Sequence, residues 1–503
     1  MTSDKKLNFF ELGALGFLLF AMFLGAGNII FAPMVGQEAG TDMWIPMTGF
    51  LITGVGLVFL AIVALAKTSG DVHRMASRVS NKYAIVFCLV LFLTLGPIYV
   101  IPRTTSVVFE IGVVPSLSNQ DTAHRLPLLI FSVIFIATTI WLSLNPNKLV
   151  DRIGKVLTPA FGILLLIIIV TSIVNPMGQV HEPLDAYTDG AFFTGFIEGY
   201  LTMDAAAALV FAGVFIQAIR SQGVNSNHGI STVFFKAGLF TVVALAILHI
   251  SLAWIGGSSV DAIGRMDNGG QLLAEASRYL LGQPGLYVIG TVVFLTGLTT
   301  NVACLTAVAD YFARVFPRVG YKRWVWINAG LGFGIANLGL ETVLSAALPV
   351  LFLLYPLSMV LILLTLVDGV FGKARAVYVG ATIATAPFAI LDAIRAANVD
   401  MSSIDAALSF IPLFTDYGGW IIPAILGGSG RLYLRASHRW KTGSGRRTVN
   451  GRACRRKGRK LAQANCLSQQ QRDRKGRNHE RHRRYRCWCH RYGQCFSIGQ
   501  RRP

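Results

Sequence analysis

Long apolar stretches recur along most of this 503-residue chain, and no other feature constrains its fold as strongly. A helix needs about 20 apolar residues to cross a bilayer, and runs near that length recur from Leu12 to Val367. About ten spans are clear, with weaker ones near 375–396 and 404–428. Hydrophobic residues make up 53% of the chain and charged residues only 14%, which excludes an ordinary soluble protein. We predict an all-α polytopic membrane protein with about 12 transmembrane helices.

The positive charge of the chain lies almost entirely at its C-terminal end. The net charge is +20, and residues 431–503 alone hold 23 Lys and Arg against 2 Asp and Glu. Because the rest of the chain is nearly neutral, the composition gives no reason to expect a nucleic-acid partner. Five of the seven cysteines lie in the same tail, which leaves Cys88 and Cys304 in the apolar body. Two isolated thiols indicate neither a disulfide framework nor a metal site.

The Lys and Arg residues between the apolar runs predict a cytoplasmic N-terminus. Positive side chains concentrate in cytoplasmic loops, and alternate connections here hold 17 of them against 4. No small-residue cleavage site follows the polar leader at 1–10, so we expect the first helix to be retained. The expected cytoplasmic set is Lys5, Lys6, Lys67, Arg74, Arg78, Lys82, Lys148, Arg152, Lys155, Arg220, Lys236, Arg314, Arg318, Lys322, Arg323, Lys373 and Arg375, and the outer set is Arg125, Arg265, Arg278 and Arg395.

The first apolar run contains residues that a continuous membrane helix does not need. The stretch AMFLGAGNIIFAPMVGQE (21–38) includes Gly25, Gly27, Asn28 and Pro33. Gly and Pro weaken a helix and a buried amide needs partners, whereas non-helical backbone at membrane depth is tolerated where it lines a cavity. Freed carbonyls can bind a cation, and a half-helix N-terminus attracts a carboxylate. The two interpretations are a ligand-binding broken helix and a glycine-packed helix with a proline kink.

A second unusual span favours the broken helix. The stretch GFIEGYLTMDAAAALVFAGVF, Gly195 to Phe215, carries Asp204 between apolar arms. An ionisable residue inside a membrane segment is costly and indicates function, although a salt bridge or an interfacial position would also explain it. This span is the sixth, five after the first. Two consecutive units of five helices insert with opposite topology, because each unit has an odd number of helices. Broken helices at matching positions of inverted halves, here 11–175 and 190–369, indicate a transporter's central site.

The eighth span supplies candidate oxygen ligands. Thr296, Thr299, Thr300 and Asn301 lie close together, and hydroxyls at i, i+3 and i+4 share one helix face. Such oxygens can complete the shell of a hard monovalent cation. The alternative is that each hydroxyl bonds to a carbonyl of its own helix.

The third span supplies a candidate ring and two charges. Tyr99 is a candidate substrate contact or lid, and Arg103 and Glu110 follow it on one helix face. For these two charged residues the sequence favours a structural role, in which they neutralise each other or lie at the outer surface.

Four stretches together carry a resemblance to a known family. FLGAGNIIFAPMVGQEAG, GPIYVIPRTTSVVFEIGV, GYLTMDAAAALVF and LPVLFLLYPLSMVLILL resemble those of the bacterial branched-chain amino acid:cation symporters, over roughly residues 8–427. The resemblance implies sodium-coupled uptake of leucine, isoleucine and valine by a twelve-helix carrier of the inner membrane. It also implies a five-plus-five inverted-repeat core of the leucine-transporter type, with helices 1 and 6 broken and no obligate protein partner.

The resemblance also implies a set of site residues. The unwound part of the sixth helix would fall within 202–206. The expected substrate-binding residues are Phe23, Gly25, Ala26, Gly27, Asn28, Tyr99, Thr202, Met203 and Ala205. The expected sodium ligands are Ala21, Leu24, Asn28, Asp204, Thr299 and Thr300.

Function is partly constrained by the residues themselves. Few charges lie near the proposed centre, which disfavours a strongly cationic or anionic substrate, and burying a branched side chain contributes about 1.5–3 kcal/mol. We predict alternating access with Na⁺ as the coupling ion. One alternative is a proton-coupled or exchange carrier with Asp204 as the proton site, and another is a channel or nutrient sensor that does not transport. We expect no enzyme, because the spans show no nucleophile–base pair, metal cluster or phosphate loop.

The C-terminal end departs from the family pattern. The segment GGWIIPAILGG (418–428) looks like the start of a twelfth helix, in an expected helix pair at 375–428, but it is too short to span a bilayer. The sequence then mixes Cys, Trp, Arg and His without period. Basic tails can bind lipid or RNA, but out-of-frame translation of a GC-rich gene end explains the abrupt shift better. In either case we expect residues 429–503 to be disordered.

Overall fold

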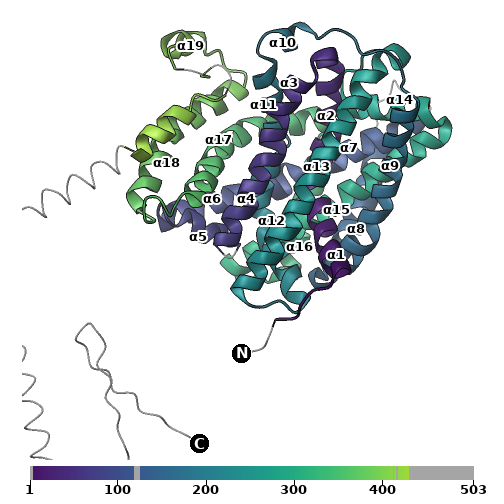
Figure 1. The fold of residues 1–503 in the computed structure, drawn as a ribbon. Helices are drawn as coiled ribbons and strands as arrows, with labels where there is room; N and C mark the ends of the chain where they lie inside the picture. Colours follow the sequence, from purple (N-terminus) through teal and green to yellow (C-terminus); the bar gives the residue numbers. More distant parts are fainter. Residues whose placement is uncertain (1–3, 69, 118–124, 412, 415–416, 430–503) are drawn as a thin grey trace, which may run out of the picture. The chain divides into compact units, whose positions relative to one another are not determined.

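The structure is a computed structural model, and every regular element that it describes is a helix (Figure 1). Chain contacts separate Met1–Leu434 from Arg435–Pro503. The predicted disordered tail falls outside the described residues except for residue 429. The described residues are 4–68, 70–117, 125–411, 413–414 and 417–429.

The helices of the first half form five apolar spans, three of them containing π-helical segments. Ile52–Gly56 joins α3 to α4, Thr94–Ile98 joins α6 to α7, and Val150–Leu157 precedes α9. The helices are α1 (Phe9–Phe23), α2 (Ala26–Ala39), α3 (Trp44–Leu51), α4 (Leu57–Lys67), α5 (Val72–Ala76), α6 (Asn81–Leu93), α7 (Val100–Gly112), α8 (Arg125–Ser143) and α9 (Thr158–Val174).

The second half continues the same all-helical pattern. Residues 421–429 are also helical. The other helices are α10 (Asp185–Thr188), α11 (Ala191–Leu201), α12 (Asp204–Ser221), α13 (Asn227–Ile263), α14 (Gly269–Leu281), α15 (Gln283–Val315), α16 (Tyr321–Ala336), α17 (Leu340–Leu366), α18 (Arg375–Ala396) and α19 (Ser402–Leu408).

The polytopic fold predicted from the apolar runs is confirmed. Within the described ranges, nine helices are long and apolar enough to cross a membrane, and the bent pair α1–α2 makes ten. The weak span predicted near 375–396 is one of the nine, as α18. Two further described helices are shorter than a membrane span: α16, with 16 residues, and the helix over residues 421–429. The weak span predicted near 404–428 is therefore not one continuous helix, because α19 ends at Leu408 and the next described helix begins at residue 421.

Both interpretations of the first glycine-rich stretch describe part of it. Helix α13 packs along α1 and α2 (Figure 1). A Cβ on Gly36 would lie 1.8 Å from the Ala253 carbonyl oxygen, and one on Gly256 would lie 1.9 Å from the Pro33 carbonyl oxygen. Glycines on both helices therefore allow close backbone contact, as in a glycine-packed interface. This contact lies on α2, away from the helix break described below.

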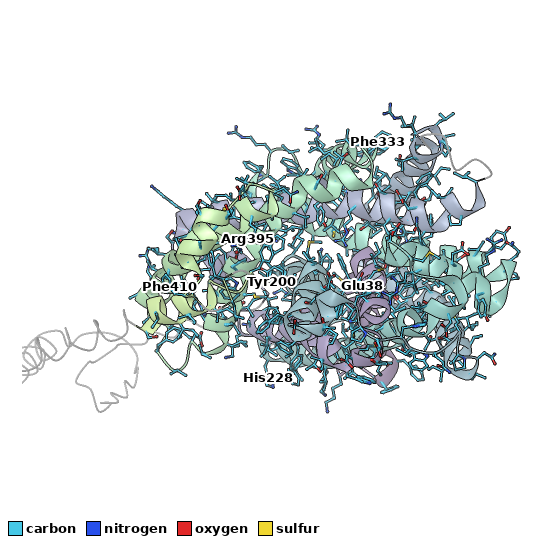
Figure 2. The ribbon with its side chains drawn as sticks, turned by 90° about the horizontal axis from the view of Figure 1, so that it is seen from above. Glu38, Tyr200, His228, Phe333, Arg395 and Phe410 are labelled. Carbon is cyan, nitrogen blue, oxygen red and sulfur yellow. The ribbon has the colours of Figure 1, made fainter. Side chains whose placement is uncertain are left out.

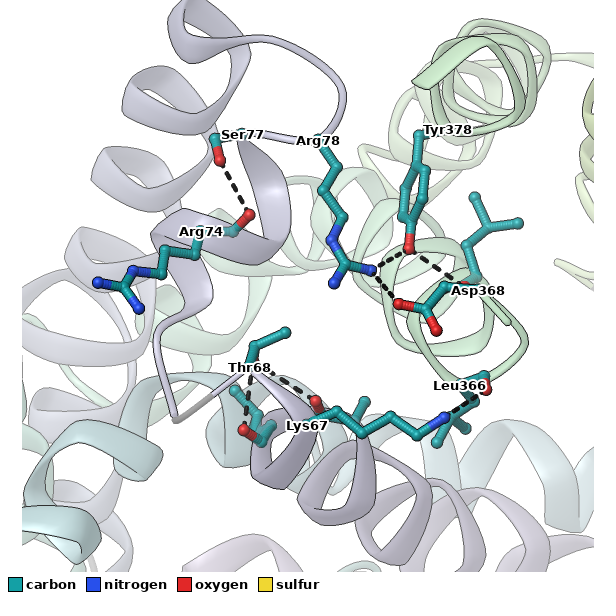
Figure 3. Close-up of polar contacts among 11 residues, drawn as sticks. Lys67, Thr68, Arg74, Ser77, Arg78, Leu366, Asp368 and Tyr378 are labelled. Atoms are coloured by element: carbon teal, nitrogen blue, oxygen red, sulfur yellow. Dashed lines mark hydrogen bonds and ion pairs between the residues drawn. The ribbon is translucent and has the colours of Figure 1, made fainter. Parts of the chain in front are cut away.

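Polar side chains tie α4 and the segment after α5 to the ends of α17 and α18 (Figure 3). Arg78 Nη1 donates to Asp368 Oδ2 at 2.8 Å and also contacts the Tyr378 hydroxyl. Lys67 Nζ donates to the Leu366 carbonyl oxygen at 2.6 Å. We call the Arg78–Asp368–Tyr378 group the ionic tie. Since α17 and α18 follow the α4–α5 region by about 300 residues, the tie fixes a long-range contact.

Aromatic rings connect the sixth span to the segment that follows α18. Tyr200 of α11, labelled in Figure 2, lies against Tyr355 of α17 with ring centroids 3.7 Å apart. Phe352, one turn earlier on α17, stacks on Tyr417 at 4.2 Å, and the Arg395 guanidinium lies 5.5 Å from the centre of the Tyr417 ring. Helices that follow the predicted repeats therefore contact the broken sixth span through α17.

Candidate functional site

The first apolar run is broken at the predicted glycine. Helix α1 ends at Phe23, and the half-helices Phe9–Phe23 and Gly27–Asp42 are bent by 69°. Leu24 (ψ 81°) and Gly25 (φ −98°, ψ 179°) leave helical geometry between them. The Asn28 side chain bridges the break, because its Nδ2 donates to the Phe23 carbonyl oxygen at 2.6 Å.

Pro33 does not mark the restart of the helix after this break. It lies inside α2, which begins at Ala26 directly after Gly25. The break therefore results from Leu24 and Gly25. In the sequence it was indicated by the glycines at 25 and 27 and not by the proline.

The sixth span is also broken, over a shorter segment than the predicted 202–206. Met203 has left-handed backbone geometry (φ 67°, ψ 12°), which costs a non-glycine residue about 1–2 kcal/mol. Helix α12 begins at Asp204, so Ala205 is helical. Asp204 thus lies in the first turn of α12, where N–H groups without helical acceptors favour a carboxylate.

The third span contains an interruption that we did not predict. Gly96 (φ −114°, ψ −113°) and Tyr99 (φ −129°, ψ −60°) depart from helical geometry on either side of Pro97. A Cβ on Gly96 would lie 2.5 Å from a methyl carbon of Val308 on α15, so glycine allows this contact. The Gly-Pro pair was the available signal.

Two threonines of α15 meet two carbonyl oxygens beside the first break. Thr299 Oγ1 donates to the Ala21 carbonyl oxygen at 3.1 Å, and Thr300 Oγ1 donates to the Leu24 carbonyl oxygen at 3.1 Å. Both carbonyls belong to the end of α1, where backbone acceptors lack helical donors. Hydroxyl and carbonyl oxygens are ligands that hard cations prefer. We call these four residues the oxygen cluster.

The other polar residues of the eighth span have structural contacts. Thr296 Oγ1 donates to the Val292 carbonyl oxygen of its own helix at 2.9 Å, as the alternative interpretation predicted. Thr299 Oγ1 likewise lies 2.9 Å from the Thr296 carbonyl oxygen of its own helix, in addition to its contact with Ala21. Asn301 Nδ2 donates to the Ile101 carbonyl oxygen and to Thr105 Oγ1, both at 3.3 Å. Asn301 therefore links α15 to α7 instead of joining the oxygen cluster.

A cavity of about 40 Å³ lies between the breaks of the first and sixth spans. Its walls come from both breaks, the third span, α12 and α15. Of the expected substrate-binding residues, Asn28, Tyr99 and Ala205 do not line it, and of the expected sodium ligands only Asp204 and Thr300 do. The lining residues are Met22, Phe23, Gly25, Gly27, Leu95, Val100, Arg103, Thr104, Thr202, Met203, Asp204, Ala207, Phe211, Thr300 and Cys304.

Three buried polar atoms beside or in this cavity have no hydrogen-bond partner among the described residues. They are Asn28 Oδ1, Arg103 Nε and Asp204 Oδ2. The Asn28 and Thr202 side chains and the Arg103 guanidinium interact with the Asp204 carboxylate. The Thr202 hydroxyl itself donates to the Gly199 carbonyl oxygen at 2.8 Å. Because buried polar atoms without partners are rare, their convergence indicates a site for a polar ligand.

The expected position of Arg103 at the outer surface is wrong, because Arg103 is 3% exposed and lines the cavity. Its Nη1 donates to Tyr99 Oη at 3.1 Å, and its guanidinium lies 5.2 Å from the centre of the Phe31 ring. An arginine in the middle of an apolar span is itself the signal in the sequence for such a site.

Comparison with known proteins identifies the family. The model of the family described as "Branched-chain amino acid transport protein" matches residues 10–435. The chain belongs to this family. It is similar to the branched-chain amino acid permease BraB of Bacillus subtilis, with 40% identity over 82% of this chain and 93% of the relative. It is also similar to the permease BrnQ of Escherichia coli K12, with 35% identity over 82% of this chain and 93% of the relative.

A solved structure shows the same fold for this member of the branched-chain amino acid transport protein family. The nucleobase-cation-symport-1 family transporter Mhp1, in a closed conformation with bromovinylhydantoin bound, aligns with a TM-score of 0.52 and 16% identity. The alignment covers 85% of this chain and 93% of that one. The predicted leucine-transporter type of fold, with its broken first and sixth helices, is confirmed.

Proposed function

We propose that this family member is a sodium-coupled symporter that carries leucine, isoleucine and valine into the cell by alternating access. The observation that carries the proposal is the cavity between two broken helices, with the oxygen cluster at its edge. The curated relatives are named as branched-chain amino acid permeases, which supports the substrate.

The oxygen cluster supplies the proposed position for Na⁺. The Thr299 hydroxyl lies 3.1 Å from the Ala21 carbonyl oxygen and the Thr300 hydroxyl lies 3.1 Å from the Leu24 carbonyl oxygen, which gives four candidate oxygen ligands from two spans. Because two of them belong to the break in the first span, a bound cation would stabilise that backbone. Of the other two expected ligands, Asn28 and Asp204, neither belongs to this cluster. They interact with each other and would serve a separate position.

The remaining cavity wall suits an aliphatic side chain. Met22, Phe23, Leu95, Val100 and Phe211 contribute apolar surface to it. A volume of about 40 Å³ holds only about three water molecules, so the walls must separate before an amino acid can enter. A closed site that has to open is what alternating access requires. If Na⁺ and substrate both favour the same state, each raises the affinity for the other.

Contacts at one end of the described helices support the predicted orientation. The Lys5 N–H donates to the Gly223 carbonyl oxygen, next to Arg220, and Lys155 interacts electrostatically with Glu11 at the start of α1. The ionic tie joins two further loops of the set expected in the cytoplasm. We propose that these loops and the N-terminus face the cytoplasm of a bacterial inner membrane, and that 11–175 and 190–369 form the two repeats.

Proton coupling is the second candidate. Asp204 Oδ2 is buried without a hydrogen-bond partner in the described part of the chain, and a carboxyl group in that position can carry a proton between the two sides of the membrane. In that case Asp204, and not the oxygen cluster, would hold the coupling ion.

The test is leucine uptake into proteoliposomes under three gradients: inward Na⁺, K⁺ in place of Na⁺, and protons alone. We expect uptake that requires Na⁺ and is competed by isoleucine and valine. Uptake driven by protons alone would replace the sodium proposal with the proton one. Flux independent of any gradient, or binding without flux, would overturn both.

A further inference from the structure

We propose that Arg103 anchors the carboxylate of the transported amino acid, with Asp204 across the cavity as the partner of its ammonium group. This assignment rests on the proposed function and names the residues that would recognise the two charged ends of the substrate. It differs from a site in which only backbone groups and the coupling ion contact the substrate.

Arg103 is held in the position that such an anchor requires. Phe31 from α2 and Tyr99 from the third span flank its guanidinium, with ring centres 5.2 and 5.3 Å from Cζ. Tyr99 Oη accepts one hydrogen bond from Nη1 at 3.1 Å. The contacts therefore fix the plane of the group but use few of its five N–H donors, and within the described ranges Nε has no hydrogen-bond partner.

The guanidinium also reaches the first helix break. A Cβ added to Gly27 would lie 3.1 Å from Arg103 Nη2 and 3.5 Å from the Thr202 carbonyl oxygen. Gly27 thus leaves room for the arginine between the breaks of the first and sixth spans. A carboxylate bound there would meet the guanidinium and the first N–H groups of α2 together.

Asp204 provides the opposite charge on the other broken helix. It is 4% exposed, it lines the same cavity, and its Oδ2 has no hydrogen-bond partner among the described residues. Arg103 acts on it electrostatically, yet the two do not form an ion pair within 4.0 Å in the part of the chain that the structure describes. The two charges therefore lie near each other with a space between them, lined by Gly27 and Thr202.

An amino acid zwitterion completes this arrangement. Burying an unpaired charge is costly, and the cost is offset when each charge gains a hydrogen-bonded partner of opposite sign. A ligand with adjacent carboxylate and ammonium groups satisfies both side chains at once, whereas a ligand with only one of these groups leaves the other side chain unpaired. The pair therefore predicts selectivity for free α-amino acids, and the apolar wall selects among their side chains.

The experiment measures competition against labelled leucine on purified protein. The competitors are leucinamide, which lacks the carboxylate, and 4-methylpentanoate, which lacks the ammonium group. The variants are Arg103→Gln, Arg103→Lys and Asp204→Asn. Arg152→Gln is the matched control, since Arg152 also lies over an aromatic ring, 4.9 Å from the centre of Trp141, and has a buried Nη1 without a hydrogen-bond partner among the residues that the structure describes.

Arg103→Gln should weaken leucine binding at least about tenfold while leaving leucinamide binding unchanged, so the preference for leucine over leucinamide collapses. Asp204→Asn should do the same to the preference for leucine over 4-methylpentanoate. Arg103→Lys keeps the positive charge but loses the planar guanidinium, so its preference for leucine over leucinamide should lie between those of the wild type and Arg103→Gln. The lysine variant also tests the assignment if the glutamine variant does not fold.

If both Arg103 variants prefer leucine over leucinamide as strongly as the wild type does, the assignment of Arg103 fails while the proposed function stands. The same loss of preference in Arg152→Gln would also overturn it, because the effect would then be structural. Absence of leucine binding by the wild type would overturn the proposed function, so the two failures are distinguishable.

Discussion

At the scale of single residues, substitutions of two threonines on α15 distinguish an ion-binding hydroxyl from a structural one. Thr300→Val removes a hydroxyl that contacts the Leu24 carbonyl oxygen, and should raise the Na⁺ concentration for half-maximal uptake roughly tenfold or more. Thr300→Ser should restore most of the activity. Thr296→Val is the matched control, because that hydroxyl bonds within its own helix. Equal Na⁺ dependence in Thr300→Val and wild type would contradict the role of the oxygen cluster.

Asp4 gives a pH-dependent prediction outside the membrane spans. Hydrogen bonds from the Ser226 hydroxyl and from the N–H groups of Ser226 and Asn225 lower the pKa of Asp4 below its ordinary value near 3.8. A lowered pKa in the folded state means that the ionised form stabilises the leader contact above pH 3.8, and that this contribution is lost as pH falls through the folded pKa.

Hydrogen exchange of the Asn225 and Ser226 amides measures this contact. At neutral pH these amides should exchange more slowly in the wild type than in Asp4→Asn, and the difference should disappear below the lowered pKa of Asp4. Asp400→Asn is the control, because its acceptor contact is with Ser402 and not with the leader. A difference between wild type and Asp4→Asn that persists at the lowest pH would contradict the prediction.

The ionic tie makes a prediction at the scale of helices. Arg78→Ala leaves Asp368, whose side chain is 9% exposed, without its partner, and should lower the free energy of unfolding by about 1–3 kcal/mol. Arg74, the neighbouring arginine drawn in Figure 3, is 73% exposed and pairs with Asp71 at 3.4 Å. Arg74→Ala should therefore cost less than about 0.5 kcal/mol. Thermal unfolding in detergent compares the two, and equal losses would contradict a structural role for the tie.

The helix breaks show what the sequence could and could not predict. Gly25 predicted the first break, because glycine in an apolar run weakens a helix. Asp204 pointed to the sixth span, but its break falls on Met203, and methionine carries no local signal for left-handed geometry. The role of Arg103 depends on which residues of α2 and α12 surround it. That is a matter of tertiary packing, which the spacing of residues within one span does not contain.

At the scale of the whole molecule, alternating access predicts that solvent reaches the cavity in one state and not in another. Cys304 lines the cavity and is 1% exposed, which makes it a reporter. Combining Cys88→Ser with removal of residues 435–503, which lie outside the unit Met1–Leu434, leaves Cys304 as the only thiol. This variant should keep leucine uptake, because the family match ends at residue 435.

Labelling of that variant with a water-soluble methanethiosulfonate reagent then measures opening. In the closed structure the thiol should react slowly, and replacing Na⁺ with K⁺ should change the rate several-fold as the populations of the open and closed states shift. Leucine with Na⁺ should slow the reaction further, because substrate fills the cavity and favours closure. A further Cys304→Ser substitution should abolish labelling. Identical rates under all three conditions would mean that the cavity does not open during the cycle, and the transport mechanism proposed above would fail.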